Sequence, residues 1–150
     1  MLKPILLVDD NRDDADLVRL VLRKSKVVNP LLICESGHEA LEYCHGIGEG
    51  NYVKPVLIIL DLKLPDIPGI EVLRSIRVNE HLWDCRVVVL TGMDEYEDTV
   101  EARILKVKVI IQKGQQFPLE IHQFFDAGIK LGIWWLLLDE RPANEGGDVS

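Results

Sequence analysis

The sequence lacks any block of lysine or arginine and any alternation of basic with aromatic residues. Its 150 residues carry 17 lysines and arginines against 25 aspartates and glutamates, which gives a net charge of −8. Proteins that bind DNA or RNA directly need a basic surface that neutralises phosphates. We therefore expect no direct contact with nucleic acid.

Cysteines are few, and no two of them have CxxC spacing. The three present, Cys34, Cys44 and Cys85, each lie in or beside an apolar segment. An odd number of such cysteines argues against a disulfide framework and favours buried free thiols in a reducing cytosol.

Long apolar segments are also missing. The most apolar stretch, Ile133–Leu138, is far too short to span a bilayer core of roughly 30 Å. Met1–Pro4 leads directly into a strand-like segment, so nothing resembles a cleavable signal peptide. These absences predict a soluble cytoplasmic protein without a membrane partner.

What the chain does contain is a regular alternation of strand-like and helix-like segments. A hydrophobic content of 47% suffices for a real core, and we expect one domain over residues 1–138 with a disordered polar tail over 139–150. The pattern predicts an α/β fold of five βα units on a mainly parallel sheet. Strands are predicted near 4–8, 31–34, 56–60, 86–90 and 108–111, and helices near 12–25, 36–45, 69–78, 94–104 and from 118 onward.

A GxGxG string, Gly46 to Gly50, follows a predicted helix rather than a strand. It therefore lacks the strand-turn-helix setting of a phosphate-binding loop. We predict an ordinary loop, with the preceding helix ending at Gly46.

Polar residues stand where the predicted strands end. Asp9 and Asp10 follow the first strand, Asp61 the third and Thr91 the fourth, and Lys113 comes after Gln112 beyond the fifth. Open parallel sheets bind ligands at the carboxyl edge of their strands. We expect three carboxylates, a hydroxyl and an ammonium to share one site there.

Three converging carboxylates need a counter-charge. Two unit charges about 4 Å apart repel by about 4 kcal/mol at an effective dielectric near 20, more than Lys113 alone can offset for three acids. Oxygen ligands without nearby His or Cys favour Mg²⁺. Magnesium beside lysine and threonine suits a phosphoryl site, with Asp61 as nucleophile.

Each residue also has a simpler explanation. Asp9 and Asp10 could cap the first helix, Asp61 could begin a turn, Thr91 could cap the fourth helix, and Lys113 could be a surface charge. The ordered placement of all of them at strand ends favours the functional interpretation.

With these motifs in place, the chain resembles the receiver domain of two-component response regulators. The resemblance covers about residues 3–135 and implies a flavodoxin-like doubly wound sheet of order 2-1-3-4-5 with helices on both faces. The matching segments are Ile5–Asn11, Leu60–Pro65 with Pro68–Gly69, Val88–Gly92, and Lys113.

By this resemblance Asp61 accepts a phosphoryl group from a histidine kinase and loses it slowly, so the protein is a signalling protein rather than a classical enzyme. Mg²⁺ would be held by Asp9, Asp10, Asp61 and the Lys63 backbone carbonyl, while Thr91 and Lys113 bind phosphoryl oxygens. The long segment before the third strand and the Trp-containing last helix resemble stand-alone receivers that partner phytochrome-type kinases.

Two positions depart from the family pattern, and two others bear on the lifetime of the phosphoryl group. Gly114 replaces the usual proline after the lysine, which predicts a trans Lys113–Gly114 bond. Ile110 stands where most receivers place a switching aromatic, so the signal is expected to leave through the loop after the fourth strand or a dimer interface. Lys63 and Met93 flank the expected path of the hydrolytic water, and Lys63 pairing with the phosphoryl group would change its lifetime.

The apolar end of the last helix suggests how the protein passes on its signal. This segment, Ile133–Leu138, either folds onto its own domain or packs on another chain, and we favour a homodimer through this helix.

The alternative to a phosphorylated receiver is a receiver-like interaction module that is not phosphorylated. A haloacid-dehalogenase-like phosphatase is less favoured, because that family needs a second acid where Lys63 stands.

Overall fold

The computed structural model describes residues 2–92, 96–114 and 117–131. It contains a five-stranded parallel sheet in the order β2-β1-β3-β4-β5. The predicted fold class and strand order are confirmed. The strands are β1 (Ile5–Val8), β2 (Leu31–Cys34), β3 (Leu57–Asp61), β4 (Arg86–Thr91) and β5 (Val109–Gln112).

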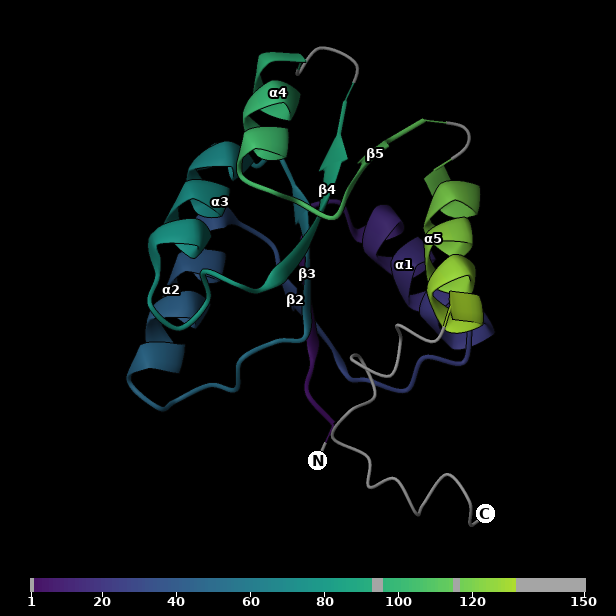
Figure 1. Ribbon diagram of the computed structural model, residues 1–150, viewed down its shortest axis with the longest axis horizontal. Coiled ribbons are helices and arrows are strands. Elements are labelled where there is room, and N and C mark those ends of the chain that lie inside the picture. Colours follow the sequence, from purple (N-terminus) through teal and green to yellow (C-terminus); the bar gives the residue numbers. More distant parts are fainter. Residues whose placement is uncertain (1, 93–95, 115–116, 132–150) are drawn as a thin grey trace.

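Helices cover both faces of this sheet (Figure 1). One face carries α2, α3 and α4, and the other carries α1 and α5. The helices are α1 (Arg12–Lys24), α2 (Gly37–Gly48), α3 (Gly69–Val78), α4 (Tyr96–Ile104) and α5 (Phe117–Leu131).

The central strands are apolar because both of their faces are covered. Alternate residues of β1, β3 and β4 enter two separate cores. Leu6, Ile58 and Val87 face the α2–α4 side, whereas Ile5 and Leu57 face α1 and α5. Two covered faces explain why these strands show continuous rather than alternating hydrophobicity.

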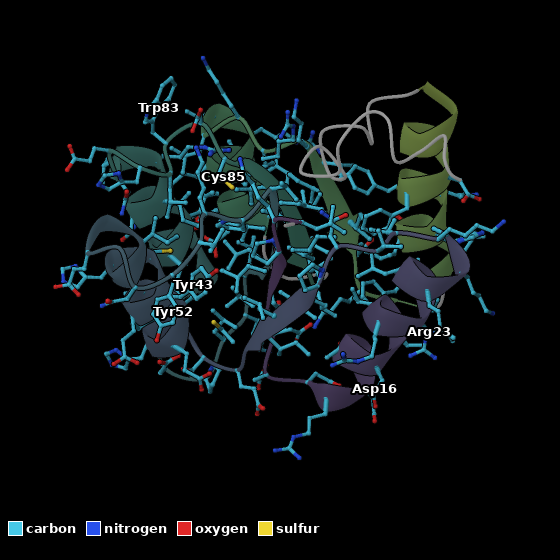
Figure 2. All side chains as sticks on the ribbon, turned by 90° about the horizontal axis from the view of Figure 1, so that it is seen from below. Asp16, Arg23, Tyr43, Tyr52, Trp83 and Cys85 are labelled. Carbon is cyan, nitrogen blue, oxygen red and sulfur yellow. The ribbon has the colours of Figure 1, made fainter. Side chains whose placement is uncertain are left out.

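Helix α2 is longer than predicted, so the expected end at Gly46 is wrong. Gly46 lies inside the helix, and a Cβ there would collide with the ring of Tyr52. That ring stacks on Tyr43 with centroids 4.8 Å apart (Figure 2). The helix ends instead at a Schellman motif, in which Gly50 has φ +81° and the Asn51 N–H donates to the Gly46 carbonyl.

The three cysteines are free and buried, as predicted. Burial raises the pKa of Cys34 to about 12 and the pKa values of Cys44 and Cys85 to about 11. Their thiols are therefore neutral at physiological pH, when they behave as small apolar side chains.

Two further expectations concern membrane spans and the end of the chain. Within the described residues, every helix is too short or too polar to span a bilayer. The predicted tail, residues 139–150, and the apolar segment Ile133–Leu138 lie outside the described residues.

Candidate functional site

The sheet brings four of the predicted residues to one edge. Asp9 directly follows β1, Asp61 and Thr91 are the last residues of β3 and β4, and Lys113 directly follows β5. The strands are neighbours in the order β1, β3, β4 and β5, and the register pairs Thr91 with Gln112. The geometric expectation behind the predicted site is therefore met.

Asp9, Asp10 and Asp61 form an acidic cluster. Each offers a carboxylate oxygen, and these atoms all lie within 4.8 Å of one another. Asp9 and Asp61 are only 1% and 4% exposed, whereas Asp10 faces solvent. A divalent metal ion fits such a cluster, because hard cations prefer carboxylate oxygens with one side open to water.

Lys113 supplies the local cation. Its Nζ lies 2.8 Å from Oδ2 of Asp9, Oδ2 of Asp61 and Oδ2 of Asp14. Burial opposes the charge on the ammonium, but these three carboxylates outweigh it and raise the pKa of Lys113. The lysine is therefore a fixed positive charge in the acidic site.

Asp14 is the residue that sequence reasoning missed. It lies in the first turn of α1, where its N–H donates to Oδ1 of the cap residue Asn11 at 3.0 Å. One signal for Asp14 was present in the sequence. It lies three residues after the cap residue, in the first turn of the helix, where its side chain is directed back toward the strand ends. The contact with Lys113 depends on how α1 lies against β5, which no local pattern states.

The surroundings of Asp9 disfavour the charged form of its carboxylate. Burial raises its pKa to about 6, although Lys113 and the Asn11 N–H, 3.0 Å from Oδ1, favour the ionised form. Oδ2 is buried and is the ion-pair partner of Lys113, but it accepts no hydrogen bond of good geometry from any residue that the structure describes. An acceptor with unused hydrogen-bonding capacity is a suitable ligand for a metal ion.

The loop after β3 fixes the Asp61 carboxylate. Oδ1 accepts a hydrogen bond from the Lys63 N–H at 3.0 Å, while Oδ2 accepts one from Lys113. The loop itself is anchored, since the Leu62 N–H donates to the Leu90 carbonyl and the Gly69 N–H donates to the Leu62 carbonyl. The Asp61 side chain is thus held from two sides.

Thr91 completes the edge. Its side chain is 4% exposed, and its hydroxyl donates to the Gly92 carbonyl at 3.1 Å. The Lys113 N–H donates to the Thr91 carbonyl at 2.8 Å, which holds the ends of β4 and β5 together. Met93, the other residue singled out in this loop, lies outside the described residues.

Comparison with known proteins agrees with this geometry. Residues 5–123 match the family model of the response regulator receiver domain. The chain belongs to this family. Over 114 residues it is 38% identical to the response regulator Rcp1 of Synechocystis sp., a match that covers 75% of this chain and 78% of Rcp1.

Solved structures of response regulators are similar as well. The Mn²⁺-bound form of Rcp1 matches with a TM-score of 0.73 and 33% identity, over 89% of this chain and 94% of that one. The phosphorylated cyanobacterial phytochrome response regulator RcpA matches with a TM-score of 0.74 and 31% identity, over 95% and 98%. Among receivers, this chain therefore resembles the phytochrome-associated group.

Two departures from the receiver pattern can be located. The Lys113–Gly114 peptide bond is trans, as predicted, because the described residues contain no cis bond. Ile110 is partly buried and packs against the core beneath α2, α3 and α4. In this receiver, an aliphatic side chain therefore fills the position of the switching aromatic.

Proposed function

We propose that this receiver takes a phosphoryl group from a histidine kinase onto Asp61 and signals by binding a partner or by dimerising. The observation that carries the proposal is the Asp61 carboxylate, buried at the end of β3 with Lys113 Nζ 2.8 Å from Oδ2. A carboxylate held beside a fixed cation is suited to attack a phosphorus atom, because the cation offsets the charge gathered there.

We assign Mg²⁺ to Asp9, Asp10, Asp61 and the Lys63 backbone carbonyl. The support is the acidic cluster and the buried Asp9 Oδ2, which accepts no hydrogen bond of good geometry from the described residues. When bound, the ion neutralises charge on phosphoryl oxygens and orients them for in-line transfer. The affinity should depend on Asp9 most, since this carboxylate is the most deeply buried of the three.

The protein groups divide the remaining tasks. A carboxylate oxygen of Asp61 forms the new bond to phosphorus as the bond from phosphorus to the kinase imidazole breaks, and the electron pair stays with the departing imidazole. Lys113 is the fixed ammonium for one phosphoryl oxygen, and the Thr91 hydroxyl turns from Gly92 to donate to another. Asp14 keeps a carboxylate on Lys113 while Asp61 carries the phosphoryl group.

Treatment with acetyl phosphate and Mg²⁺ tests the acceptor. Intact-mass measurement should show one labile phosphoryl adduct in the native chain and none in Asp61→Asn. A native chain that stays unmodified would favour the interaction module without phosphorylation. Multiple-turnover release of phosphate from small phosphate esters would favour the phosphatase alternative instead.

Lys63 is proposed to set the lifetime of the aspartyl phosphate. Its side chain is exposed, two residues after Asp61, in the loop that contacts the acceptor carboxylate. Lys63→Ala should therefore change the rate of adduct loss, followed by mass over time. An unchanged half-life would remove Lys63 from the mechanism.

We propose a phytochrome-type histidine kinase as partner and a homodimer through helix five, with helix four taking part. The relatives named above support the first assignment. The participation of helix four is supported by Tyr96, Val100 and Ile104, which form an exposed apolar row along α4 at helical spacing. Sedimentation at high concentration should show a dimer; a monomer would contradict it.

A further inference from the structure

A second charged site lies at the opposite edge of the sheet. A pocket of about 640 Å³ opens where β3 and β4 begin and where α4 turns into β5. Six of the chain's 17 basic residues line it, and among the described residues that line it Asp84 is the only acid. The six are Lys3, Lys54, Arg77, Arg86, Lys106 and Lys108.

The wall of the pocket is tied together by Arg77. Its guanidinium donates to the carbonyls of Leu105 and Cys85, each at 2.7 Å, and to those of Trp83 at 3.1 Å and Lys106 at 3.3 Å. These bonds join the end of α3 to the approach to β4 and to the turn after α4. The pocket is thus pre-formed rather than dependent on a bound ligand.

Several of the cations are available for a ligand. Lys54 is paired with Asp84 at 2.8 Å, whereas Arg86, Lys106 and Lys108 form no ion pair with any residue that the structure describes. In a chain of net charge −8, so many cations around one pocket create a local positive field that attracts anions.

An aromatic ring stands at the rim of the same pocket. Trp83 is 61% exposed and lies at the outside of the molecule, with Cys85 inward of it (Figure 2). An exposed indole is a platform on which a flat ring can stack. Indole and cations together favour a ligand that is aromatic at one end and anionic at the other.

The sheet topology argues for a small ligand rather than a peptide that adds a strand. Both β3 and β4 have a neighbouring strand on each side, so neither has a free edge at the pocket. The volume lies within the range of small-molecule sites, about 300–1,000 Å³.

From this geometry we infer that the pocket binds an aromatic phosphate ester of nucleotide size. The ring stacks on Trp83, and the phosphates lie against Arg86, Lys106 and Lys108. Arg86 begins β4 and Thr91 ends it, so this site and the phosphoryl site occupy opposite ends of the same strand. The two sites can therefore be occupied independently.

Calorimetric titration with ADP in EDTA tests the inference. EDTA removes divalent metal, so a phosphate cannot bind through an ion at the acidic cluster. ADP should bind the full chain more tightly than either adenosine or inorganic phosphate, and more weakly as salt is raised. Asp61→Asn should bind ADP equally well, which separates this test from that of the proposed function.

Matched variants locate the site. Lys106→Ala with Lys108→Ala removes two exposed charges from the pocket and should weaken ADP binding at least about tenfold. Arg19→Ala with Arg23→Ala removes the same charge from the exposed face of α1 and should leave binding unchanged. Trp83→Ala should weaken ADP about tenfold without affecting inorganic phosphate.

Three results would overturn the assignment. ADP no tighter than inorganic phosphate would mean that the ring is not recognised. An equal loss of affinity in both double variants would mean a general charge effect. Tighter binding of an acidic Trp-containing peptide than of ADP, abolished by the pocket variant, would identify a protein segment as the ligand class instead.

Discussion

Asp9 keeps a carboxylate where its surroundings disfavour charge. Burial raises its pKa to about 6 in the folded protein, whereas an unfolded chain has a value of about 3.9. The folded state therefore binds this proton more tightly. The stability linked to it is fully present below about pH 4 and is lost as the pH rises through about 6. In metal-free buffer at pH 7, the ionised Asp9 is thus a source of instability.

Asp9→Asn should accordingly stabilise the metal-free protein. The amide removes the buried charge, keeps an oxygen that can accept from the Asn11 N–H, and leaves Lys113 with Asp14 and Asp61. Because the amide also loses the attraction of Lys113, which offsets part of this gain, we expect the free energy of unfolding at pH 7 in EDTA to rise by only about 1 kcal/mol. Urea denaturation measures this change.

The pH dependence and a neighbouring variant serve as controls. The gain from Asp9→Asn should shrink toward pH 4, where the native aspartate is also neutral. Asp10→Asn, at an exposed position, should change stability by less than about 0.5 kcal/mol. A destabilised Asp9→Asn protein would show that the ion pair with Lys113 outweighs the cost of burial.

The site residues were predictable to the extent that they follow strands. Asp9, Asp61 and Thr91 end apolar runs, and parallel strands carry such residues to one edge. Asp14 was not predictable, because its contact with Lys113 joins α1 to the end of β5. A helix position shows which residues share a face, but not which strand end lies opposite that face.

At the scale of elements, Gly69 lets α3 begin directly against the acceptor loop. A Cβ at this position would meet the Asp61 carbonyl oxygen and, at 2.5 Å, the Leu62 Cα. Backbone atoms cannot move aside as a flexible side chain can. Gly69 does not have a left-handed φ, so this position needs a glycine for close packing and not for its backbone conformation.

Gly69→Ala should destabilise the domain by about 2 kcal/mol, the usual cost of overpacking a rigid site. It should also slow phosphorylation of Asp61, because the loop that holds the carboxylate must shift. Gly114→Ala is the matched control: nothing lies within 4 Å of a Cβ there, so its stability should be unchanged or slightly raised. Urea denaturation and the acetyl phosphate assay measure both effects. Equal stability of the two variants would contradict the packing argument.

Asp66 connects the acceptor loop to a second element. Its carboxylate oxygens accept hydrogen bonds from the N–H groups of Gly37 at 2.8 Å and His38 at 2.9 Å, at the start of α2. These amide bonds, that from His38 above all, hold the pKa of Asp66 below its usual range. The loop after β3 and the first turn of α2 are thus joined by one exposed side chain.

Asp66→Ala should loosen this junction. Hydrogen exchange at the Gly37 and His38 amides should accelerate, because both lose their acceptor while the Ser36 cap of α2 remains. Asp66→Asn keeps one acceptor oxygen, so exchange at these amides should be faster than in the native chain and slower than in Asp66→Ala. Unchanged exchange at both amides in Asp66→Ala would show that the first turn of α2 is held by other contacts.

Helix ends illustrate where local sequence reasoning fails. The glycine string after α2 was interpreted as a helix stop at Gly46, but the ring of Tyr52 covers that glycine and the helix continues to Gly48. Of the three glycines in this string, only Gly50 has a positive φ. A glycine needed for packing and one needed for a turn look alike in sequence, and tertiary contacts distinguish them.

At the scale of the molecule, the fold separates charge into two edges. Acids gather at the carboxyl ends of the strands, and cations gather around the pocket at the amino ends. No basic block marks this pocket in the sequence, because the six cations are spread from Lys3 to Lys108. Strand order was predictable from the family resemblance, whereas this second grouping needed the positions of loops and helix ends.

The acidic edge links metal binding to the stability of the whole domain. A ligand that binds only the folded state stabilises it by about 2.7 kcal/mol when its free concentration is 100 times the Kd. Mg²⁺ should therefore raise the free energy of unfolding of the native chain, and by much less in Asp9→Asn and Asp61→Asn, which each lose a charged ligand. Urea denaturation at pH 7, in EDTA and in increasing Mg²⁺, measures this increment.

The pocket variant Lys106→Ala with Lys108→Ala is the control for this linkage. It leaves all three carboxylates intact at the opposite edge, so it should gain as much stability from Mg²⁺ as the native chain. An undiminished Mg²⁺ increment in Asp9→Asn would place the ion elsewhere and contradict the assigned ligands. A smaller increment in the pocket variant would mean that the two edges of the sheet are energetically coupled through β4 and β5.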